Sequence, residues 1–400
     1  MNPARSYMNA IGTAVPAYAH DQNRIAQFMA ETLQLDKADR RRLMALFSHT
    51  KIDTRYSVLP DYSRPNGQFT FYPNTLDPKP FPTVGQRMEI YRREAVPLAL
   101  QAIRACLADY PEFSLQSLTH LVVVSCTGFY APGPDIDLVE ALGLPGTTQR
   151  LLIGFMGCYG ALNGLKAADA IVRADPDAHV LVVCVELCTL HFQKSDRPVD
   201  WLANALFGDG AAAVLIQSRA RIDQSFAVQS FYSDLLPEGR DEMAWTIRDW
   251  GFDMTLTAKV PAIIQRSIAV LLERLLNRNK LTISQVDYFA LHPGGRRILE
   301  VIEAQLNIEP EKSRFAFEVL SRYGNMSSAT ILFVLKAIWN ELADSQADVP
   351  NRPFHQISGI AFGPGLTIES MLLLAQIGQP ERKQAPLADV RVDHLHLVES

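Results

Sequence analysis

The chain has 400 residues, of which 48% are hydrophobic and 20% are charged. This composition is ordinary for a globular protein and excludes a disordered chain, and the length suits one large α/β domain or two similar halves. The net charge of -5 gives no basic field over the whole protein, so nucleic acid is not an expected partner.

The five cysteines lie mostly in apolar runs rather than at the spacings of a disulfide framework. This usage indicates a reducing compartment, and we expect a cytoplasmic protein. Residues 1–18 lack the sustained apolar core of a signal peptide and predict a short strand that ends at a turn. No apolar run approaches the roughly 20 residues that cross a membrane, so no membrane span is expected.

Buried strands are predicted in the first half at three apolar, β-branched runs: 120–126, 179–185 and 211–216. Unbroken apolarity is typical of strands that are covered on both faces. A helical pattern begins near Cys158, between the first two strands. The second half repeats this order, with a strand at 287–291, a helix after Asn325, and strands at 356–362 and 368–376.

The spacing indicates an internal duplication. From the strand end at Cys126 to the helix start at Cys158 there are 32 residues, and from His292 to Asn325 there are 33. A pseudo-twofold axis would bring these four residues toward one centre. Chance remains the alternative for two matching intervals.

A polar stretch near 218–245 is the expected boundary, which gives an N-terminal half over 1–225 and a C-terminal half over 226–378. Residues 56–86 are rich in Pro, Tyr, Asn and Asp and predict a long surface excursion. Residues 379–400 predict a flexible tail.

Cys158 follows a glycine in GFMGCYGA, at the start of a helix of small and apolar residues. The N–H groups and partial positive charge of a helix N-terminus stabilise a thiolate, so we expect a lowered pKa and a nucleophilic role for Cys158. The small neighbours leave room for a substrate. The structural alternative is an inert cysteine of the core.

His292 and Asn325 are the candidate partners of this thiol. His292 ends a buried strand and precedes the turn PGG, which exposes the strand end. Asn325 follows a glycine at a helix start, where its amide could donate a hydrogen bond to an oxyanion. The alternatives are a core histidine bonded to the backbone and an N-cap asparagine.

Three further features fit a small substrate on a phosphorylated carrier. AFGPG at 361–365 predicts a rigid wall, and LFGDGAAA at 206–213 places Phe207 beside a turn. The basic run at 39–55 predicts either a clamp for phosphates or a solvated helix face.

The motifs GFMGCYGA, ALFGDGAAA, LHPGG, RYGNMSSA and AFGPGLTIE are similar in order and interval to those of the type III polyketide synthases, the chalcone and stilbene synthase family. The resemblance covers about residues 8 to 377, and CTGFYAPGPD and ELCTLHF resemble bacterial members that make alkylpyrones or alkylresorcinols. It implies an α/β, thiolase-like fold, with two pseudo-duplicated βαβ halves in five α/β/α/β/α layers, and a homodimer.

The resemblance also implies a catalytic triad of Cys158, His292 and Asn325. Cys158 would attack an acyl-CoA starter, for which we expect a fatty acyl chain, and His292 would hold the thiolate as an ion pair. His292 and Asn325 would bind malonyl-CoA and stabilise the enolate left by loss of CO2. Chain extension and cyclisation would give an alkylpyrone or an alkylresorcinol or phloroglucinol-type product. No metal or redox cofactor is implied.

By the same resemblance, Phe207 is a gatekeeper between a CoA tunnel and the cavity, and Met254 stands where the family usually has a second Phe. The other substrate-binding positions implied are Cys126, Thr127, Cys188, His191, Ser327, Ala361, Phe362, Gly363 and Pro364. Plant members commonly carry hydroxyl residues or glycine at four of these positions. Of the family's basic CoA-binding residues only Arg42 has a match here.

Other functions stay open at this point. A ketoacyl synthase of the fatty-acid initiation type shares the fold and the triad, but it is usually shorter and lacks the AFGPG wall. A cysteine hydrolase would release the same acyl-enzyme to water. A non-catalytic binding protein is the third alternative, and the intact triad argues against it.

Overall fold

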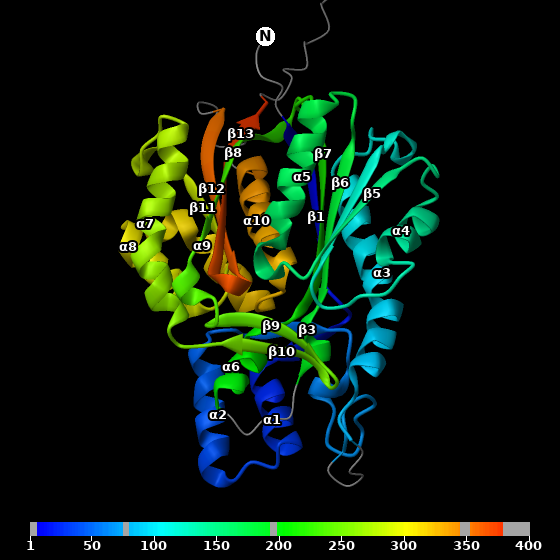
Figure 1. The fold of residues 1–400 in the computed structure, drawn as a ribbon, viewed down its shortest axis with the longest axis vertical. Helices are drawn as coiled ribbons and strands as arrows, with labels where there is room; N and C mark the ends of the chain where they lie inside the picture. Colours follow the sequence, from blue (N-terminus) through cyan, green and yellow to red (C-terminus); the bar gives the residue numbers. More distant parts are fainter. Residues whose placement is uncertain (1–5, 75–79, 193–197, 345–352, 379–400) are drawn as a thin grey trace, which may run out of the picture.

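The two halves form five stacked layers, as Figure 1 shows for the computed structural model, which describes residues 6–74, 80–192, 198–344 and 353–378. Outer helices, one half of a sheet, two central helices, the other half of the sheet and further outer helices follow one another across the molecule. The predicted fold class, a thiolase-like α/β fold, is confirmed.

The strands of the two halves belong to one nine-stranded sheet with the order β11-β12-β13-β8-β1-β7-β6-β4-β5. The first half contributes β1 (Tyr7–Ala14), β4 (His120–Ser125), β5 (Gln149–Gly154), β6 (Val180–Leu187) and β7 (Asp209–Gln217). The second half contributes β8 (Gln224–Leu235), β11 (Tyr288–Leu291), β12 (Phe354–Gly363) and β13 (Thr367–Ile377).

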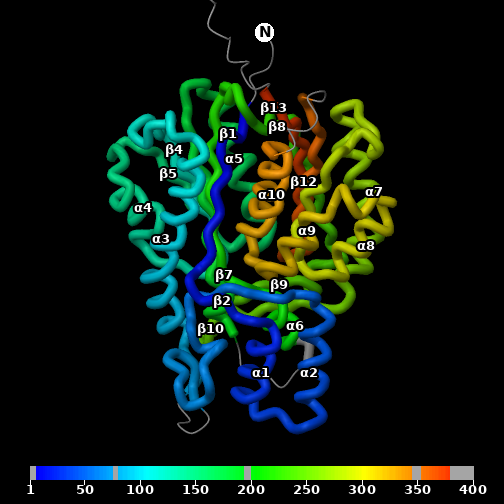
Figure 2. The backbone as a smooth tube through the Cα atoms, turned by 180° about the vertical axis from the view of Figure 1, so that it is seen from behind, coloured from blue at the N-terminus to red at the C-terminus, as the bar shows by residue number. Residues whose placement is uncertain are grey.

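The pairing of the strands shows the internal duplication. Outward from the centre, β1, β7, β6 and β4 pair as antiparallel, antiparallel and parallel, and β8, β13, β12 and β11 repeat that series. The halves meet where β1 pairs with β8, at Tyr7 with Ala227 and Met8 with Phe226. From behind, β1 runs down the middle of the molecule (Figure 2).

Helices cover both faces of each half. On the first half, α3 (Val84–Ala108) and α4 (Pro134–Leu142) lie outside, and on the second half α7 (Val260–Arg278) packs on β8 and β13 with α8 (Arg296–Leu306) against it. The central layer consists of α5 (Gly160–Ala174) and α10 (Thr330–Asp344), and α9 (Pro310–Tyr323) packs on α10 and β11.

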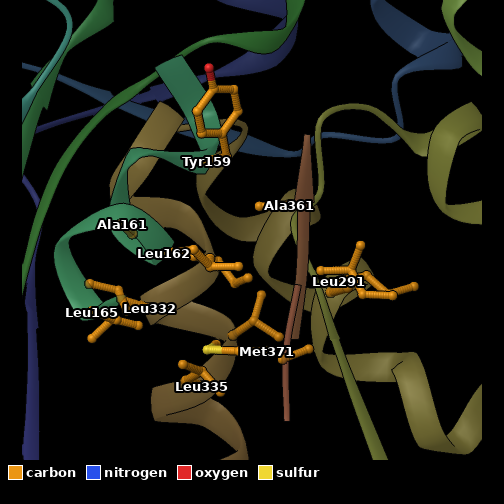
Figure 3. Packing of buried hydrophobic residues seen from close by; sticks show 14 of the residues in the cluster. Tyr159, Ala161, Leu162, Leu165, Leu291, Leu332, Leu335, Ala361 and Met371 are labelled. Carbon is orange, nitrogen blue, oxygen red and sulfur yellow. The ribbon is translucent and has the colours of Figure 1, made fainter. Parts of the chain in front are cut away.

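β6 explains why apolar runs predicted the core correctly. All eight of its residues are buried: Val182 and Cys184 belong to the cluster around the central helices, and Leu181 and Val183 to the cluster under α3. Apolar side chains of α5 and α10, among them Leu165 and Leu332, lie side by side between the halves (Figure 3). Burial on both faces favours unbroken apolar sequence.

The remaining elements gather at one end of the layers (Figures 1 and 2). They are the helices α1 (Gln22–Thr32), α2 (Lys37–His49) and α6 (Pro198–Leu206), the pair β2 (Tyr18–Asp21) and β3 (Thr54–Ser57), and the pair β9 (Met243–Arg248) and β10 (Gly251–Leu256). The β9–β10 hairpin lies across this end, beneath the central helices.

The expected boundary stretch contains a strand, and the segment 56–86 is more than the surface excursion that was expected. The stretch 218–245 contains β8, the strand of the second half that pairs with β1. In the segment 56–86, Tyr62 and Tyr72 are buried and surround the ring of Phe28 at 4.8 and 5.8 Å, and the Asp61 carboxylate accepts four hydrogen bonds from Thr70, Phe71 and Tyr72. The predicted tail, 379–400, lies outside the described residues.

Candidate active site

Cys158 lies in a short turn ahead of the central helix α5. The turn is a 3-10 helix over Gly157–Tyr159, and α5 begins at Gly160. Gly157 has a positive φ of 77°, and a Cβ there would lie 2.3 Å from Cδ of Pro364. Only glycine fits this close approach, which presses the AFGPG turn against the nucleophile candidate.

The second half repeats this turn with a different register from the one predicted. Its 3-10 helix is Ser327–Ala329, with a positive φ of 49° at Ser327, and α10 begins at Thr330. Ser328 therefore occupies the position that Cys158 has in the first half, and Asn325 lies three residues before it. The predicted equivalence of Cys158 and Asn325 was wrong, because equal intervals do not reveal where a turn passes into its helix.

Both residues nevertheless line one cavity between the halves, called the central cavity below. The predicted residues that line it are Cys126, Thr127, Cys158, Cys188, Phe207, Met254, His292, Asn325, Ser327, Phe362 and Pro364. Cys126 directly follows β4 and His292 directly follows β11, so two equivalent strand ends meet at this cavity as the duplication predicted.

Both ends of the Asn325 amide lie 4.0 Å from Sγ of Cys158. Its Oδ1 accepts a hydrogen bond from the backbone N–H of Ser327 at 2.8 Å, which fixes the orientation of the amide. Nδ2 is then the free donor, and it lies 4.0 Å from Sγ of Cys158. An amide N–H beside a nucleophile is suited to stabilising negative charge on a substrate oxygen.

His292 is buried, and neither nitrogen of its ring has a hydrogen-bond partner within the described parts of the chain. Its backbone is held, because the N–H of His292 donates to Ile360 at 2.8 Å. Burial lowers the pKa of His292 to about 3, so the imidazole is neutral at physiological pH. Its ring therefore has one acceptor and one donor left for a thiol or a substrate.

The thiol of Cys158 is also neutral. Burial raises the pKa of Cys158 to about 12, so the expectation that the helix start lowers this pKa was wrong. Cys158 is 8% exposed and lies ahead of α5, where loss of water outweighs the helix dipole. Burial therefore favours the uncharged forms of both Cys158 and His292.

A buried carboxylate that the sequence analysis missed holds two residues that line the cavity, Cys126 and Thr127. Glu186 ends the apolar part of β6 and accepts hydrogen bonds from the Cys126 N–H at 3.0 Å, Thr127 Oγ1 at 2.8 Å and Ser328 Oγ at 2.5 Å. Its side chain is fully buried, and burial raises its pKa. The signal in the sequence was a single acidic residue at the end of an otherwise apolar strand.

The β9–β10 hairpin forms a roof over the cavity, and of its lining residues only Met254 was predicted. Met243, Trp245 and Leu256 from this hairpin, and Ile298 from α8, line the central cavity. Nε1 of Trp245 donates to the carbonyl of Cys126 at 2.8 Å, which ties the roof to the end of β4. The roof makes the cavity largely apolar.

A second cavity, the side cavity, lies next to the first. The two share Cys188, Phe207, Trp245 and Met254, so Phe207 and Met254 stand between them. His191 lines only the side cavity: its Nε2 donates to the Thr127 carbonyl at 2.7 Å, and its Nδ1 accepts from Phe252 N–H at 3.1 Å.

Three other predicted positions do not line the central cavity. Ala361 is fully buried in the core, near the central helices in Figure 3. A Cβ on Gly363 would lie 2.4 Å from the Tyr159 ring, so this glycine permits close packing. Arg42 lies on α2 with a side chain 72% exposed and pairs with Asp39 at 3.0 Å.

Two absences hold for the described part of the chain. It contains no group of three or more His, Cys, Asp or Glu side chains placed to hold a metal ion. None of its helices is both long and apolar enough to cross a membrane.

Comparisons with known proteins cover almost the whole chain. Residues 2–220 match the family model for chalcone and stilbene synthases, N-terminal domain, and residues 225–377 match the C-terminal domain of the same family. Alpha-pyrone synthesis polyketide synthase-like Pks18 from Mycobacterium tuberculosis is 32% identical over 369 residues, which are 91% of this chain and 90% of the relative. Type III polyketide synthase A from Arabidopsis thaliana is 31% identical over 93% of both chains.

Solved structures show the same relation. The crystal structure of PKS-I from the brown alga Ectocarpus siliculosus has a TM-score of 0.84 and 29% identity, and covers 94% of this chain and all of its own. The C-terminal type III polyketide synthase domain of Steely1 from Dictyostelium has a TM-score of 0.81 and 29% identity, over 92% of this chain and 99% of that domain.

Proposed function

Because the chain belongs to the chalcone and stilbene synthase family of type III polyketide synthases, transferases that condense acyl-CoA with malonyl-CoA, we propose that its substrate is a fatty acyl-CoA starter and its product an alkylpyrone or an alkylresorcinol or phloroglucinol-type compound. The observation that carries the site assignment is the meeting of Cys158, His292 and Asn325 in the central cavity.

Priming begins with Cys158. His292, neutral and without a partner on either ring nitrogen within the described residues, takes the thiol proton as the sulfur attacks the starter thioester. The C–S bond to CoA breaks, and the CoA thiolate leaves with the proton from the imidazolium. The acyl chain is then held on Cys158 in the apolar central cavity.

Condensation uses the other half of the site. Nδ2 of Asn325 and the imidazole N–H of His292 donate to the thioester oxygen of malonyl-CoA, which stabilises the enolate formed as the C–C bond to CO2 breaks. The enolate carbon attacks the acyl carbonyl on Cys158, and the thiolate leaves. Each cycle lengthens the chain by two carbons and frees Cys158.

The lining supports the proposed starter and product class. Met243, Met254, Leu256, Ile298 and Phe362 present apolar surface that suits an alkyl chain. The flexible Met254 faces Phe207 across the passage between the two cavities, where it can adapt to chains of different length. Pks18, which is 32% identical to this chain over 369 residues, is described as acting in alpha-pyrone synthesis.

An open groove beside the start of α8 is suited to the phosphates of CoA. Lys51, Arg296 and Arg322 line this basic groove together with the acidic Asp53 and Glu318, and its volume is about 530 Å³. Arg296 opens α8 two residues after Gly294, which lines the central cavity. We assign the CoA phosphates to the basic groove, and Arg42, which lines neither the groove nor the cavities, to the solvated face of α2.

A homodimer in the cytoplasm completes the proposal. β5 is an edge strand of the sheet, and its Leu151 and Leu152 are 42% and 40% exposed, so a second copy could cover this edge. All five cysteines are free thiols, which suits a reducing compartment. The halves 1–225 and 226–378 are the proposed domains.

To test the proposed function, purified protein is incubated with malonyl-CoA and a series of acyl-CoA starters, and the products are identified by mass spectrometry. Pyrones or resorcinols are expected, and Cys158→Ala should abolish them. The control is Cys106→Ala, a buried cysteine of α3 that lines neither cavity.

Free fatty acid without extension would instead indicate the cysteine hydrolase, and a single condensation that stops at a β-ketoacyl product would indicate the ketoacyl synthase. Wild-type chain extension by Cys158→Ala would refute the assignment of the nucleophile.

A further inference from the structure

The C-terminal end of α6 is capped by side chains from two distant segments. Nη1 of Arg55 donates to the carbonyls of Asn204 at 2.7 Å and Phe207 at 2.6 Å, and Nε2 of Gln22 donates to the carbonyl of Ala205 at 2.8 Å. Nε of Arg55 donates to Oε1 of Gln22 at 2.8 Å, so the two caps hold each other. The last carbonyls of a helix have no partner within it, and here they are bound by buried donors.

Two backbone hydrogen bonds join this helix end to Asn325 of the proposed active site. The backbone N–H of Asn325 donates to Leu206 at 2.8 Å, and the N–H of Gly208 donates to Asn325 at 2.9 Å, which makes a parallel bridge between Phe207 and Asn325. The gatekeeper position and the oxyanion donor of the proposed function therefore share one pair of backbone hydrogen bonds.

Arg55 lies directly against this bridge. A Cβ on Gly324, the residue before Asn325, would lie 2.9 Å from Cγ and Cδ of Arg55 and 2.7 Å from the carbonyl of Leu206. Gly324 has a positive φ of 69°, which favours glycine as well. Arg55 is 3% exposed and lines the side cavity but not the central cavity, so it contacts the bridge and not the reacting atoms.

We propose that Arg55 is a positioning residue for the malonyl half-reaction: by binding the carbonyls of Asn204 and Phe207 it fixes the Phe207–Asn325 bridge, and so the direction of the Asn325 amide. This inference rests on the proposed function. In Arg55, Nη1 binds both carbonyls while Nε is fixed by Gln22, and lysine has no second nitrogen to be fixed in this way, so Arg55→Lys keeps the charge and loses the geometry.

The test separates the two half-reactions. Acylation of Cys158 by an acyl-CoA, followed by intact-protein mass spectrometry, does not use Asn325 in the proposed mechanism. Loss of CO2 from malonyl-CoA does. For Arg55→Lys we expect malonyl decarboxylation to fall about tenfold or more, and acylation to stay within about threefold of wild type.

Arg87→Lys is the matched control. Arg87 is also a buried arginine, and it donates to the carbonyls of Pro82, Leu190 and Phe192, away from the bridge. Arg87→Lys should lower stability without changing the ratio of the two rates. Gln22→Met removes the Ala205 cap, the Thr50 contact and the acceptor of Arg55 Nε but leaves Nη1 of Arg55 on its two carbonyls, so it should change the ratio less than Arg55→Lys does.

Equal losses of acylation and decarboxylation in Arg55→Lys, or a ratio that Arg87→Lys changes as much, would refute the positioning role while wild-type turnover still upheld the proposed function. An unchanged decarboxylation rate in Arg55→Lys would refute it too. A wild-type protein that neither acylates Cys158 nor decarboxylates malonyl-CoA would instead refute the proposed function.

Discussion

The two central helix starts have the same architecture and opposite chemistry. In the first half, the turn with the positive φ at Gly157 presents Cys158, a thiol facing the cavity. In the second half, the matching turn at Ser327 presents Ser328, whose hydroxyl is bound to Glu186, and the reactive group is Asn325, three residues earlier. The duplicated scaffold brings both turns to one cavity, while the residue that acts is set separately in each half.

Asn325→Ala tests the different roles of the two helix starts, and it has the largest expected effect. Loss of one oxyanion donor should slow malonyl-CoA decarboxylation about 100-fold or more, because Nδ2 is the free donor beside Cys158. Acylation of Cys158 should stay within about threefold of wild type, since that step belongs to the other half. Release of CO2 and intact-protein mass measure the two steps, and a parallel loss of both would contradict the division of roles.

Ser328→Ala tests whether the position equivalent to Cys158 is structural. Ser328 is fully buried and donates to Glu186, so its removal leaves a buried carboxyl group with one donor fewer. We expect a loss of about 1–3 kcal/mol in the free energy of unfolding, measured by denaturant titration, with both half-reactions retained. Unchanged stability, or a selective loss of one half-reaction, would show that Ser328 has another role.

The burial of His292 makes the stability of the protein depend on pH. Its pKa is about 3 in the folded protein and about 6.5 in the unfolded chain, so below pH 6.5 the unfolded state binds a proton that the folded state does not. Stability is therefore lost as pH falls from 6.5 toward 3, by up to about 1.4 kcal/mol per pH unit for this group.

His292→Asn should reduce this slope, as measured by denaturant titrations between pH 7 and 5. The control is His49→Asn, which changes an exposed histidine of α2. A slope in His292→Asn equal to that of wild type would mean that another group causes the loss.

A substitution in the basic groove has the smallest expected effect, a change in the KM for malonyl-CoA. Arg322 is exposed and Arg296 opens α8, so the second half supplies two of the three cations of the groove. Arg322→Glu should raise the KM for malonyl-CoA about threefold to tenfold with little change in kcat, and more so at low salt. Arg42→Glu on α2 is the matched control, and an equal or larger rise in that variant would move the phosphate site to α2.

The sequence predicted what depends on local pattern. Unbroken apolar runs identified β4, β6 and β7, because a strand that is buried on both faces favours apolar side chains at successive positions. The equal intervals predicted that four residues meet at one centre, and all four line the central cavity: Cys126, Cys158, His292 and Asn325.

What the sequence could not predict depends on contacts between distant segments. The polar residues of β8 placed it in the expected boundary stretch, and Trp245 becomes a roof residue only when the β9–β10 hairpin folds over the end of β4. The pKa of Cys158 rises because of burial, which the helix start alone does not reveal. The Arg55 caps join residues 149 and 152 positions apart.

The most direct test of the account is the site of acylation. Wild-type protein incubated with a fatty acyl-CoA alone, then digested and analysed by mass spectrometry, should carry the acyl group on Cys158 and on none of Cys106, Cys126, Cys184 or Cys188. Adding malonyl-CoA should remove that label as the extended product forms. Acylation of another cysteine, or a label on Cys158 that malonyl-CoA does not discharge, would contradict the account.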